Sequence, residues 1–193
     1  MRSLTLIGFI LLFIVVDMSG CASIPGRTGK EQSEAIDALV ERTLTDLYKQ
    51  EPKSKEEIGK SIGYAIMKNR FTKIPIVGAG SGYGVSITNK TGEKTYLKIV
   101  RFDIGSGLGT RSIRLVITFQ NEEKFKDFID GDWSVNAGAA LAAKSKDAGT
   151  SGAAESSSLS GGKGYSIHVI TDAGVTATVT VGVIHVKPIK LKD

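Results

Sequence analysis

The sequence predicts an α+β fold in which N-terminal helices pack on a strongly curved, mostly antiparallel, glycine-rich β-sheet or small barrel. Three observations lead to this prediction. Apolar residues recur with helical spacing between residues 31 and 62, and they alternate with polar residues over most of residues 63–190. In two of the alternating stretches, glycine occupies every second position. The length of 193 residues fits one ordinary domain preceded by an export segment.

The composition is that of a folded and mildly basic chain. Hydrophobic residues make up 41% and charged residues 23%, which is typical of a domain that buries a core. The net charge of +5 is unchanged when residues 1–20 are removed, because the charges of Arg2 and Asp17 in this segment sum to zero. A basic exported domain is attracted to anionic lipid headgroups. Export, and the lack of aromatic residues interleaved with basic ones, argue against a nucleic-acid partner.

Residues 1–20 have the organisation of a signal peptide. Arg2 provides a short positive region, and the 13 residues from Leu4 to Val16 are nearly all apolar. As a helix this stretch spans about 20 Å, which is shorter than the bilayer hydrocarbon core of about 30 Å. The length therefore indicates a signal peptide that is removed on export, and not a membrane-spanning helix.

The single cysteine predicts a lipid anchor directly after this segment. Cys21 has no partner for an internal disulfide, and it follows the small residues Ser19 and Gly20. Met18 to Cys21 resembles the lipobox of bacterial lipoproteins, in which the cysteine sulfur receives a diacylglyceryl group and becomes the new N-terminus. The alternative is an ordinary signal peptide with a chance cysteine. The resemblance implies a lipid-anchored protein of the bacterial cell envelope that faces the periplasm, and Ala22 favours the outer membrane.

Two helices are predicted at the start of the mature domain. Apolar residues form one helical stripe over residues 31–50, and Glu51–Pro52 ends it. Ser54 and Glu57 have the spacing of a capping box, which predicts a second helix to about residue 62. The predicted organisation is a lipidated tether at 21–30 and one domain at 31–193, with helices at 31–62 and a sheet region at 63–190.

The sheet region is predicted to form strands around one short helix. Asn121 as N-cap and Gly131 as the closing residue delimit a helix at 121–129. A serine- and glycine-rich stretch at 144–164 predicts a loop. Strands are predicted at 64–67, 74–87, 95–102, 113–119 and 133–143, followed by two C-terminal strands of which the last covers 175–186.

Glycines of one strand parity form two rows. The first row is Gly78, Gly80, Gly82 and Gly84, and the second is Gly105, Gly107 and Gly109. Residues of one parity project from the same face of a strand, so each row presents a strip of bare backbone. Such strips permit another element to pack closely or the sheet to bend sharply. The alternative is a smooth groove for an acyl chain or a headgroup phosphate.

The sequence offers no catalytic or metal-binding pattern. His168 and His185 have no carboxylate at ligand spacing, so neither a metal nor another cofactor is predicted. His185 shares the parity of the valines in the last strand, which places it on the apolar face. Asp127, Asp130 and Asp132 are interpreted as a solvated helix end, with a cation site as the alternative. An enzyme is therefore not predicted.

Basic residues group near the two glycine rows. The group around Phe71 comes before the first row, and a second group follows the second row; the cations are Lys68, Arg70, Lys73, Arg111 and Arg114. One interpretation is an ordinary solvated surface. The other is a patch in which these cations bind anionic lipid headgroups while Phe71 inserts into the membrane.

With these residues in view, the region from about Gly63 to Ile189 resembles the SYLF domain, a lipid-binding module of bacterial lipoproteins and of eukaryotic actin-patch and endosomal proteins. The resemblance depends on the order of several stretches. They are Gly63–Ile66, Gly80–Val85, Ile104–Gly109, Ile117–Phe125 with Phe128 and Asp132–Trp133, Ala137–Ala143, and Asp172–Val175 with Gly182. Lys68–Phe71 departs from the family, which has an apolar and proline-containing stretch there, and the loop at 145–163 is richer in serine and glycine.

The resemblance implies a domain that binds phosphoinositides or other anionic lipids, without a ligand set that can be carried over residue by residue. Actin binding, a property of eukaryotic members, is not expected of an exported bacterial lipoprotein. The leading hypothesis is therefore a membrane-anchored envelope lipoprotein that binds anionic lipid. The alternative is a tethered structural or adaptor protein that presents its sheet to a protein partner in the cell envelope.

Overall fold

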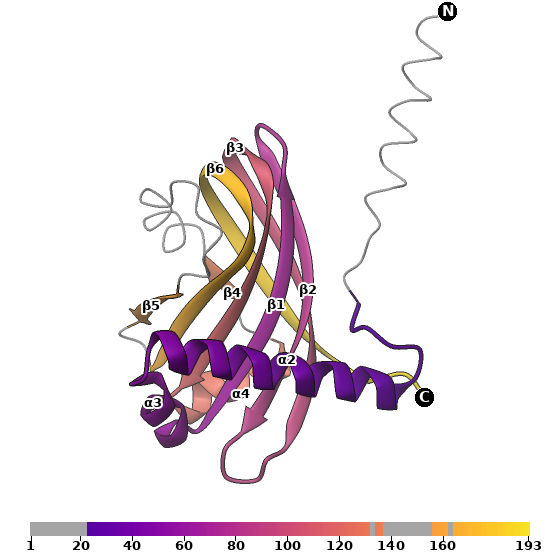
Figure 1. Ribbon diagram of the computed structural model, residues 1–193, viewed down its shortest axis with the longest axis vertical. Coiled ribbons are helices and arrows are strands. Elements are labelled where there is room, and N and C mark those ends of the chain that lie inside the picture. Colours follow the sequence, from indigo (N-terminus) through magenta and orange to yellow (C-terminus); the bar gives the residue numbers. More distant parts are fainter. Residues whose placement is uncertain (1–22, 132–133, 137–155, 162–163) are drawn as a thin grey trace, which may run out of the picture.

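In the computed structural model, the structure describes residues 23–131, 134–136, 156–161 and 164–193. The predicted signal peptide, the predicted lipidation site Cys21, and most of the predicted strand at 133–143 and loop at 144–164 lie outside the described residues. The described part is a mixed α+β structure in which helices cover an antiparallel sheet (Figure 1). The predicted fold class is confirmed, with two refinements: the described strands do not close into a barrel, and one helix follows the third strand.

The first helix, α2 (Gly29–Gln50), begins slightly before its predicted start. Thr28 is its N-cap, and the Thr28 hydroxyl accepts a hydrogen bond from the backbone N–H of Glu31 at 3.3 Å. Ile36, Leu39 and Leu47 are buried, as the apolar stripe predicts. The amphipathic pattern therefore identifies both the helix and the face by which it packs.

The second helix, α3 (Ser54–Lys60), is shorter than predicted and does not begin with a capping box. Its N-cap is Lys53, which makes no side-chain capping hydrogen bond. Ser54 instead donates its hydroxyl hydrogen to the carbonyl oxygen of Glu51 at 2.6 Å, across the turn between the two helices. Glu57 is directed toward the sheet, where its carboxylate accepts a hydrogen bond from Thr118 at 2.6 Å.

The third helix, α4 (Glu122–Asp130), has the predicted caps. Oδ1 of Asn121 accepts a hydrogen bond from the backbone N–H of Lys124 at 2.9 Å. Gly131 ends the helix with a φ of +88°, a conformation that glycine adopts without strain. Phe125 and Phe128 are buried and pack with the inner face of the sheet, so α4 contributes to the core on that side.

Six strands form the sheet. They are β1 (Gly63–Lys73), β2 (Val77–Thr88), β3 (Lys94–Phe119), β4 (Ser134–Asn136), β5 (Ser156–Gly161) and β6 (Tyr165–Ile189). Their order is β1-β2-β3-β6-β4, with β5 also paired to β6. The predicted strands at 95–102 and 113–119 are two parts of β3, the two predicted C-terminal strands are one strand, and β5 occupies part of the predicted loop. Glycines interrupt the apolar alternation without ending these strands.

The long strands β3 and β6 bend over together. β2 pairs with residues 94–104 of β3, whereas β1 pairs with residues 109–119. β1 and β2 are antiparallel to each other, and each is antiparallel to its own part of β3, so β3 must turn sharply between the two parts. β6 pairs with both parts of β3 and follows the same turn. Figure 1 shows both strands bending at the upper end of the molecule.

Glycines of the first row allow β2 to lie very close to β1. A Cβ atom added at Gly80 would lie 2.5 Å from Cβ of Phe71, and one added at Gly82 would strike the carbonyl oxygen of Lys68. Gly84 has an equivalent contact with β1. The strip is therefore packed against β1 at these positions and is not an open groove there. Nearer the bend of β3 lie the remaining glycines of the two rows, Gly78, Gly105, Gly107 and Gly109.

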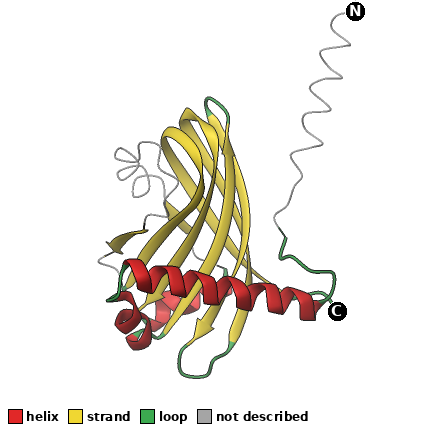
Figure 2. Cartoon of the chain, in the orientation of Figure 1, coloured by secondary structure: helices red, strands yellow, loops and turns green. Residues whose placement is uncertain are grey.

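The bend gives the sheet an inner and an outer face, and both are covered. On the inner face, residues such as Met67 and Leu97 form one core with α4. On the outer face, Ile66 and Val116 form a second core with α2 and α3. Figure 2 shows α2 crossing the strands on this outer side. Neighbouring residues of one strand, such as Ile66 and Met67, are therefore both fully buried.

The placement of His185 on the apolar face is wrong. His185 is exposed, while its neighbours Ile184 and Val186 are buried. Ile184 and Val186 belong to the core on the inner face, so His185 between them points to the opposite face. Asp172 is an extra residue in the β3–β6 register, between Thr171 opposite Ile113 and Ala173 opposite Ser112.

We predict that Gly82→Ala lowers the free energy of unfolding by about 1–3 kcal/mol, because the new methyl group must displace the backbone of β1. Urea denaturation of the purified variant measures the change. The matched control is Gly59→Ala in α3, where an added Cβ has no atom within 4 Å. This control should be neutral or raise stability by up to about 1 kcal/mol. Equal losses in the two variants would contradict the prediction.

Candidate functional site

One end of the sheet exposes a group of large apolar side chains. Each is between 51% and 70% exposed, and the group consists of Ile74, Ile76, Val77, Phe102, Ile104 and Leu108. The sheet register explains why they lie together: Val77 is opposite Ile104, Ile74 and Ile76 lie in the turn between β1 and β2, and Leu108 lies at the bend of β3. We call these six residues the apolar tip.

Three arginines lie in the strand positions next to the apolar tip. Phe71 of β1 is opposite Gly80 of β2 and also opposite Arg111 of β3. Gly80 is in turn opposite Arg101 in the first part of β3. Arg70 precedes Phe71 and is exposed. We call Arg70, Arg101 and Arg111 the arginine row.

Phe71 is buried, so its predicted insertion into a membrane is not supported. Its side chain is 5% exposed, and the guanidinium carbon of Arg101 lies 4.3 Å from the centroid of its ring. This is the geometry of a cation–π contact. The absence of a side chain at Gly80, which lies between the two residues in the register, leaves room for Arg101 to reach the ring. The exposed aromatic side chain at this end is Phe102.

Arg111 is half-buried beside Arg101 in an electropositive environment. Burial lowers the pKa of the Arg111 guanidinium, and the positive charge of Arg101 lowers it further. The guanidinium group of arginine keeps its positive charge at neutral pH. Arg101 and Arg111 both also make contacts within the fold. Two cations are thus held within repulsive distance of each other.

The other predicted headgroup ligands, Arg70 of the arginine row included, do not form one cluster with Arg101 and Arg111. Lys68 and Arg70 alternate with Phe71 and so belong to the outer face of β1, where Lys68 is half-buried. Lys73 is the last residue of β1, next to the apolar tip. Arg114 lies opposite Lys68 in the β1–β3 pair. The predicted patch is therefore divided between the two faces of the sheet.

Arg114 holds α2 on the sheet and is not available to a headgroup. It is 2% exposed, and its guanidinium pairs with Asp46 of α2 at 2.7 Å and with Asp172 of β6 at 2.6 Å. Burial lowers the pKa of Arg114, but the hydrogen bonds and charges of the two carboxylates outweigh it and raise the pKa. Asp172 lies at the irregularity of the β3–β6 register, two residues after Ile170, which is opposite Arg114. The predicted headgroup role of Arg114 is corrected accordingly.

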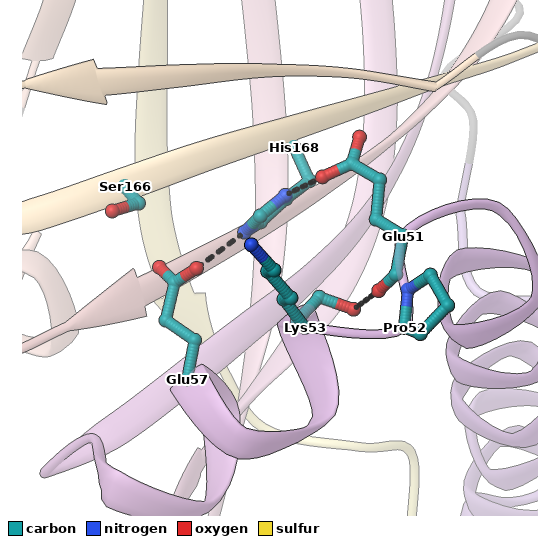
Figure 3. A pocket seen from close by; sticks show the side chains of 7 residues that line it. Glu51, Pro52, Lys53, Glu57, Ser166 and His168 are labelled. Carbon is teal, nitrogen blue, oxygen red and sulfur yellow. Dashed lines mark hydrogen bonds and ion pairs between the residues drawn. The ribbon is translucent and has the colours of Figure 1, made fainter.

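A second polar site lies where the turn between α2 and α3 meets β6 (Figure 3). It is a pocket of about 530 Å³ lined by Glu51, Pro52, Lys53, Ser54, Glu57, Ser166 and His168. His168 is buried, and its Nδ1 lies 2.9 Å from a carboxylate oxygen of Glu51. Its Nε2 faces a carboxylate oxygen of Glu57 at 3.4 Å.

The geometry of this pocket joins the helices to the sheet. Figure 3 shows Glu51 and Glu57 on opposite sides of the imidazole ring, so the two carboxylates do not converge with the ring on one point in space. Glu51 ends α2, Glu57 belongs to α3, and His168 belongs to β6. Sequence spacing shows no sign of this contact, because Glu51 and His168 are separated by 117 positions.

Sequence reasoning missed the apolar tip and Arg101, although the sequence contains a signal for each. Pro75 interrupts an apolar run that is assigned to a strand, and proline in such a run indicates a turn or a strand edge. Arg101 shares strand parity with Leu97 and Ile99, so an arginine on an apolar face was visible. Such a cation marks a site that needs a partner.

No family model matches the chain. The chain is similar to "Beta cell expansion factor A" from Aeromonas veronii, with 29% identity over 107 residues. The matched region covers 55% of this chain and 41% of that protein, so the chain spans less than half of the relative's length. Within the described residues, none of the helices has both the length and the apolar character needed to cross a bilayer.

Arg114→Met should lower the free energy of unfolding by about 3 kcal/mol, because it removes a buried cation and leaves the Asp172 carboxylate, which is only 17% exposed, without its partner. Urea denaturation at neutral pH tests this expectation. Lys94→Met provides the matched control, since it breaks the solvent-exposed ion pair with Asp37. Its expected cost is below about 1 kcal/mol. Similar losses in both variants would show that Arg114 does not hold the helix on the sheet.

Glu57 predicts an acid-sensitive contribution to stability. Burial raises the pKa of its carboxyl group, but hydrogen bonds from Thr118 and Ser166 and the charge of His168 outweigh burial, and the pKa lies below its ordinary value. The folded state therefore favours the carboxylate more strongly than the unfolded state does. The resulting stabilisation is present at neutral pH, above the unfolded-state pKa of about 4.3, and is lost as the pH falls through the lower folded-state pKa.

Glu57→Gln should consequently lose less stability than the unmodified chain when urea denaturation is repeated at decreasing pH below about 4.5. Glu56→Gln is the control, because Glu56 lies on the same helix and is exposed, paired only at the surface with Lys60. The control should follow the unmodified chain across the pH series. Parallel curves for all three proteins would refute the assignment.

Proposed function

We propose that this chain is a membrane-anchored lipoprotein of a bacterial cell envelope that binds anionic lipid through the apolar tip and the arginine row. In this proposal the domain is of the SYLF type, Cys21 carries the acyl anchor, and the domain faces the periplasm from the outer membrane. The observation that carries the proposal is the position of the arginine row directly beside six exposed apolar side chains.

The dimensions of the tip fit a bilayer interface. Each strand residue advances about 3.3 Å, so the turn that contains Ile74 and Ile76 extends about 10 Å beyond Phe71. Apolar surfaces that dock on a bilayer enter it by about 5–10 Å, as far as the boundary between headgroups and acyl chains. At that depth the isoleucines reach the acyl boundary, while Arg70 and Arg111 lie at the level of the lipid phosphates.

Apolar burial and charge contribute comparable free energies. Complete burial of an isoleucine side chain is worth about 1.5–3 kcal/mol. Each cation held near an anionic surface adds about 1 kcal/mol. Arg70 is exposed and able to act in this way, and the net charge of +5 acts in the same direction. The apolar term supports binding to any bilayer, and the charge selects an anionic one.

The proposed anchor makes even weak docking effective. Ile24 is 4% exposed and packs with α2, so the folded domain begins three residues after Cys21. Three residues span at most about 11 Å. An acylated Cys21 therefore keeps the domain at a bilayer surface, where a high effective concentration replaces part of the affinity once the sheet tilts its apolar tip toward the lipid.

The test is flotation of residues 22–193, which keep every described residue but lack the anchor, with vesicles of phosphatidylcholine alone or mixed with phosphatidylglycerol. We expect binding to the anionic vesicles, and we expect it to weaken from 0.1 to 1 M NaCl as the Debye length falls from about 10 to about 3 Å. Ile76→Ser should reduce partitioning about tenfold, since one apolar anchor is lost.

Ile76→Leu is the matched control, because it keeps an apolar side chain at the same exposed position. It should bind as the unmodified chain does. Failure to float with anionic vesicles at low salt, or equal binding by Ile76→Ser, would remove the proposal. A dominant protein adduct at the tip after crosslinking in intact cells would instead favour the adaptor hypothesis.

A further inference from the structure

The inner face of the sheet carries an amide side chain beside the arginine row. Asn69 lies two residues before Phe71 on β1, opposite Gly82 of β2 and opposite Ile113 of β3. Arg111 is two residues from Ile113 on the same face, which makes it a diagonal cross-strand neighbour of Asn69. An arginine side chain is long enough to span such a distance, so the register places the amide within reach of the guanidinium.

Asn69 is buried without hydrogen-bond partners. It is 0% exposed, and within the described part of the chain neither its Nδ2 nor its Oδ1 has a partner. Buried side-chain amides in folded proteins almost always have at least one partner, and an exception indicates a bound water, ion or ligand. The amide offers two donors and one acceptor to such a group.

The positive charge around Asn69 favours an anion as the group that binds to its amide. Arg101 is 3% exposed and Arg111 is half-buried, and burial together with the positive charge of Arg101 lowers the pKa of Arg111. Both make contacts within the fold, so the argument does not depend on a missing partner for either. It depends on two positive charges held close together out of water, where electrostatic interactions are strong. An anion relieves their repulsion.

We propose that Asn69, Arg101 and Arg111 form a binding site for one phosphate-type oxyanion. Each guanidinium presents a planar fork of N–H donors that matches the oxygens of a phosphate. The Nδ2 group of Asn69 adds a further donor on the inner side. The half-buried Arg111 gives access from the end of the sheet that carries the apolar tip.

This site differs in kind from the general attraction of Arg70 to a charged surface. Arg70 is exposed on the outer face and contributes a screened, non-saturable attraction. The inner cluster takes one group in a fixed geometry and is therefore saturable. For one of the two sources of the oxyanion, the headgroup of a lipid docked at the tip, the inference rests on the proposed function. The other source is free inorganic phosphate.

The experiment uses the ¹⁵N-labelled chain of residues 22–193 and follows the side-chain amide signals of Asn69, which are identified by their loss in Asn69→Ser. Three probes are compared: sodium phosphate against sodium chloride at equal ionic strength, phosphatidylglycerol bicelles, and phosphatidylcholine bicelles. We expect a saturable shift of the Asn69 signals with phosphate or with phosphatidylglycerol, and none with chloride or with phosphatidylcholine.

Two variants on β3 separate the site from overall charge. Arg111→Gln should weaken the saturable response about tenfold or more, because it removes a charged hydrogen-bond donor. Lys98→Gln removes the same charge from an exposed position on the same strand and should leave the response unchanged. If Arg111→Gln does not fold, the titration of the unmodified chain decides the question alone.

Each result has a defined meaning. A shift with inorganic phosphate identifies a free-anion site, and a shift with phosphatidylglycerol only identifies a lipid headgroup site. Asn69 signals that do not move with either probe, or an equal effect of Lys98→Gln, overturn the inference. Flotation that depends on Ile76 without any Asn69 shift leaves the proposed function standing while the inference fails. If the Asn69 signals shift with inorganic phosphate but the chain does not float with anionic vesicles, the inference stands and the proposed function fails.

Discussion

The close approach of β2 to β1 determines how the rest of the molecule is built. At Gly80, Gly82 and Gly84 even a methyl group would collide with β1, so the two strands pack more tightly than residues with side chains permit. Tight packing here, together with the bend of β3 and β6, gives the sheet an enclosed inner face and an outer face that α2 can cover. The same bend carries the turn between β1 and β2 beyond the covered part, so its apolar residues are left exposed.

Burial gives chemically identical residues different roles. Arg114 faces the helix layer, where Asp46 and Asp172 neutralise it. Arg101 faces the inner side and lies over an aromatic ring next to a second arginine. Arg70 is exposed. The first arginine stabilises the fold, the second belongs to the proposed oxyanion site, and in the proposed function the third attracts anionic lipid over a longer range. Position relative to the two cores, and not residue type, separates these roles.

The pocket around His168 and the arginine row lie in different parts of the molecule and have different roles. The pocket around His168 lies at the junction of the helices with β6, and its carboxylates hold the two layers together. The apolar tip and the arginine row lie at the end of the sheet where β3 bends. In the proposed function the tip enters the bilayer interface, while the helix layer and the junction remain outside it. A stable scaffold thereby presents a short apolar projection at a fixed depth relative to its cations.

The sequence by itself determined the local features. Helical periodicity identified α2, and Asn121 and Gly131 identified both ends of α4, because capping depends on neighbouring residues alone. Alternation and glycine parity indicated a curved antiparallel sheet. Only the tertiary structure decided which face each strand residue occupies. Phe71, Arg114 and His185 were misplaced because both faces of the sheet are covered, so alternation along one strand does not identify the face that a given side chain occupies. Such assignments depend on contacts between distant segments, and no local pattern records them.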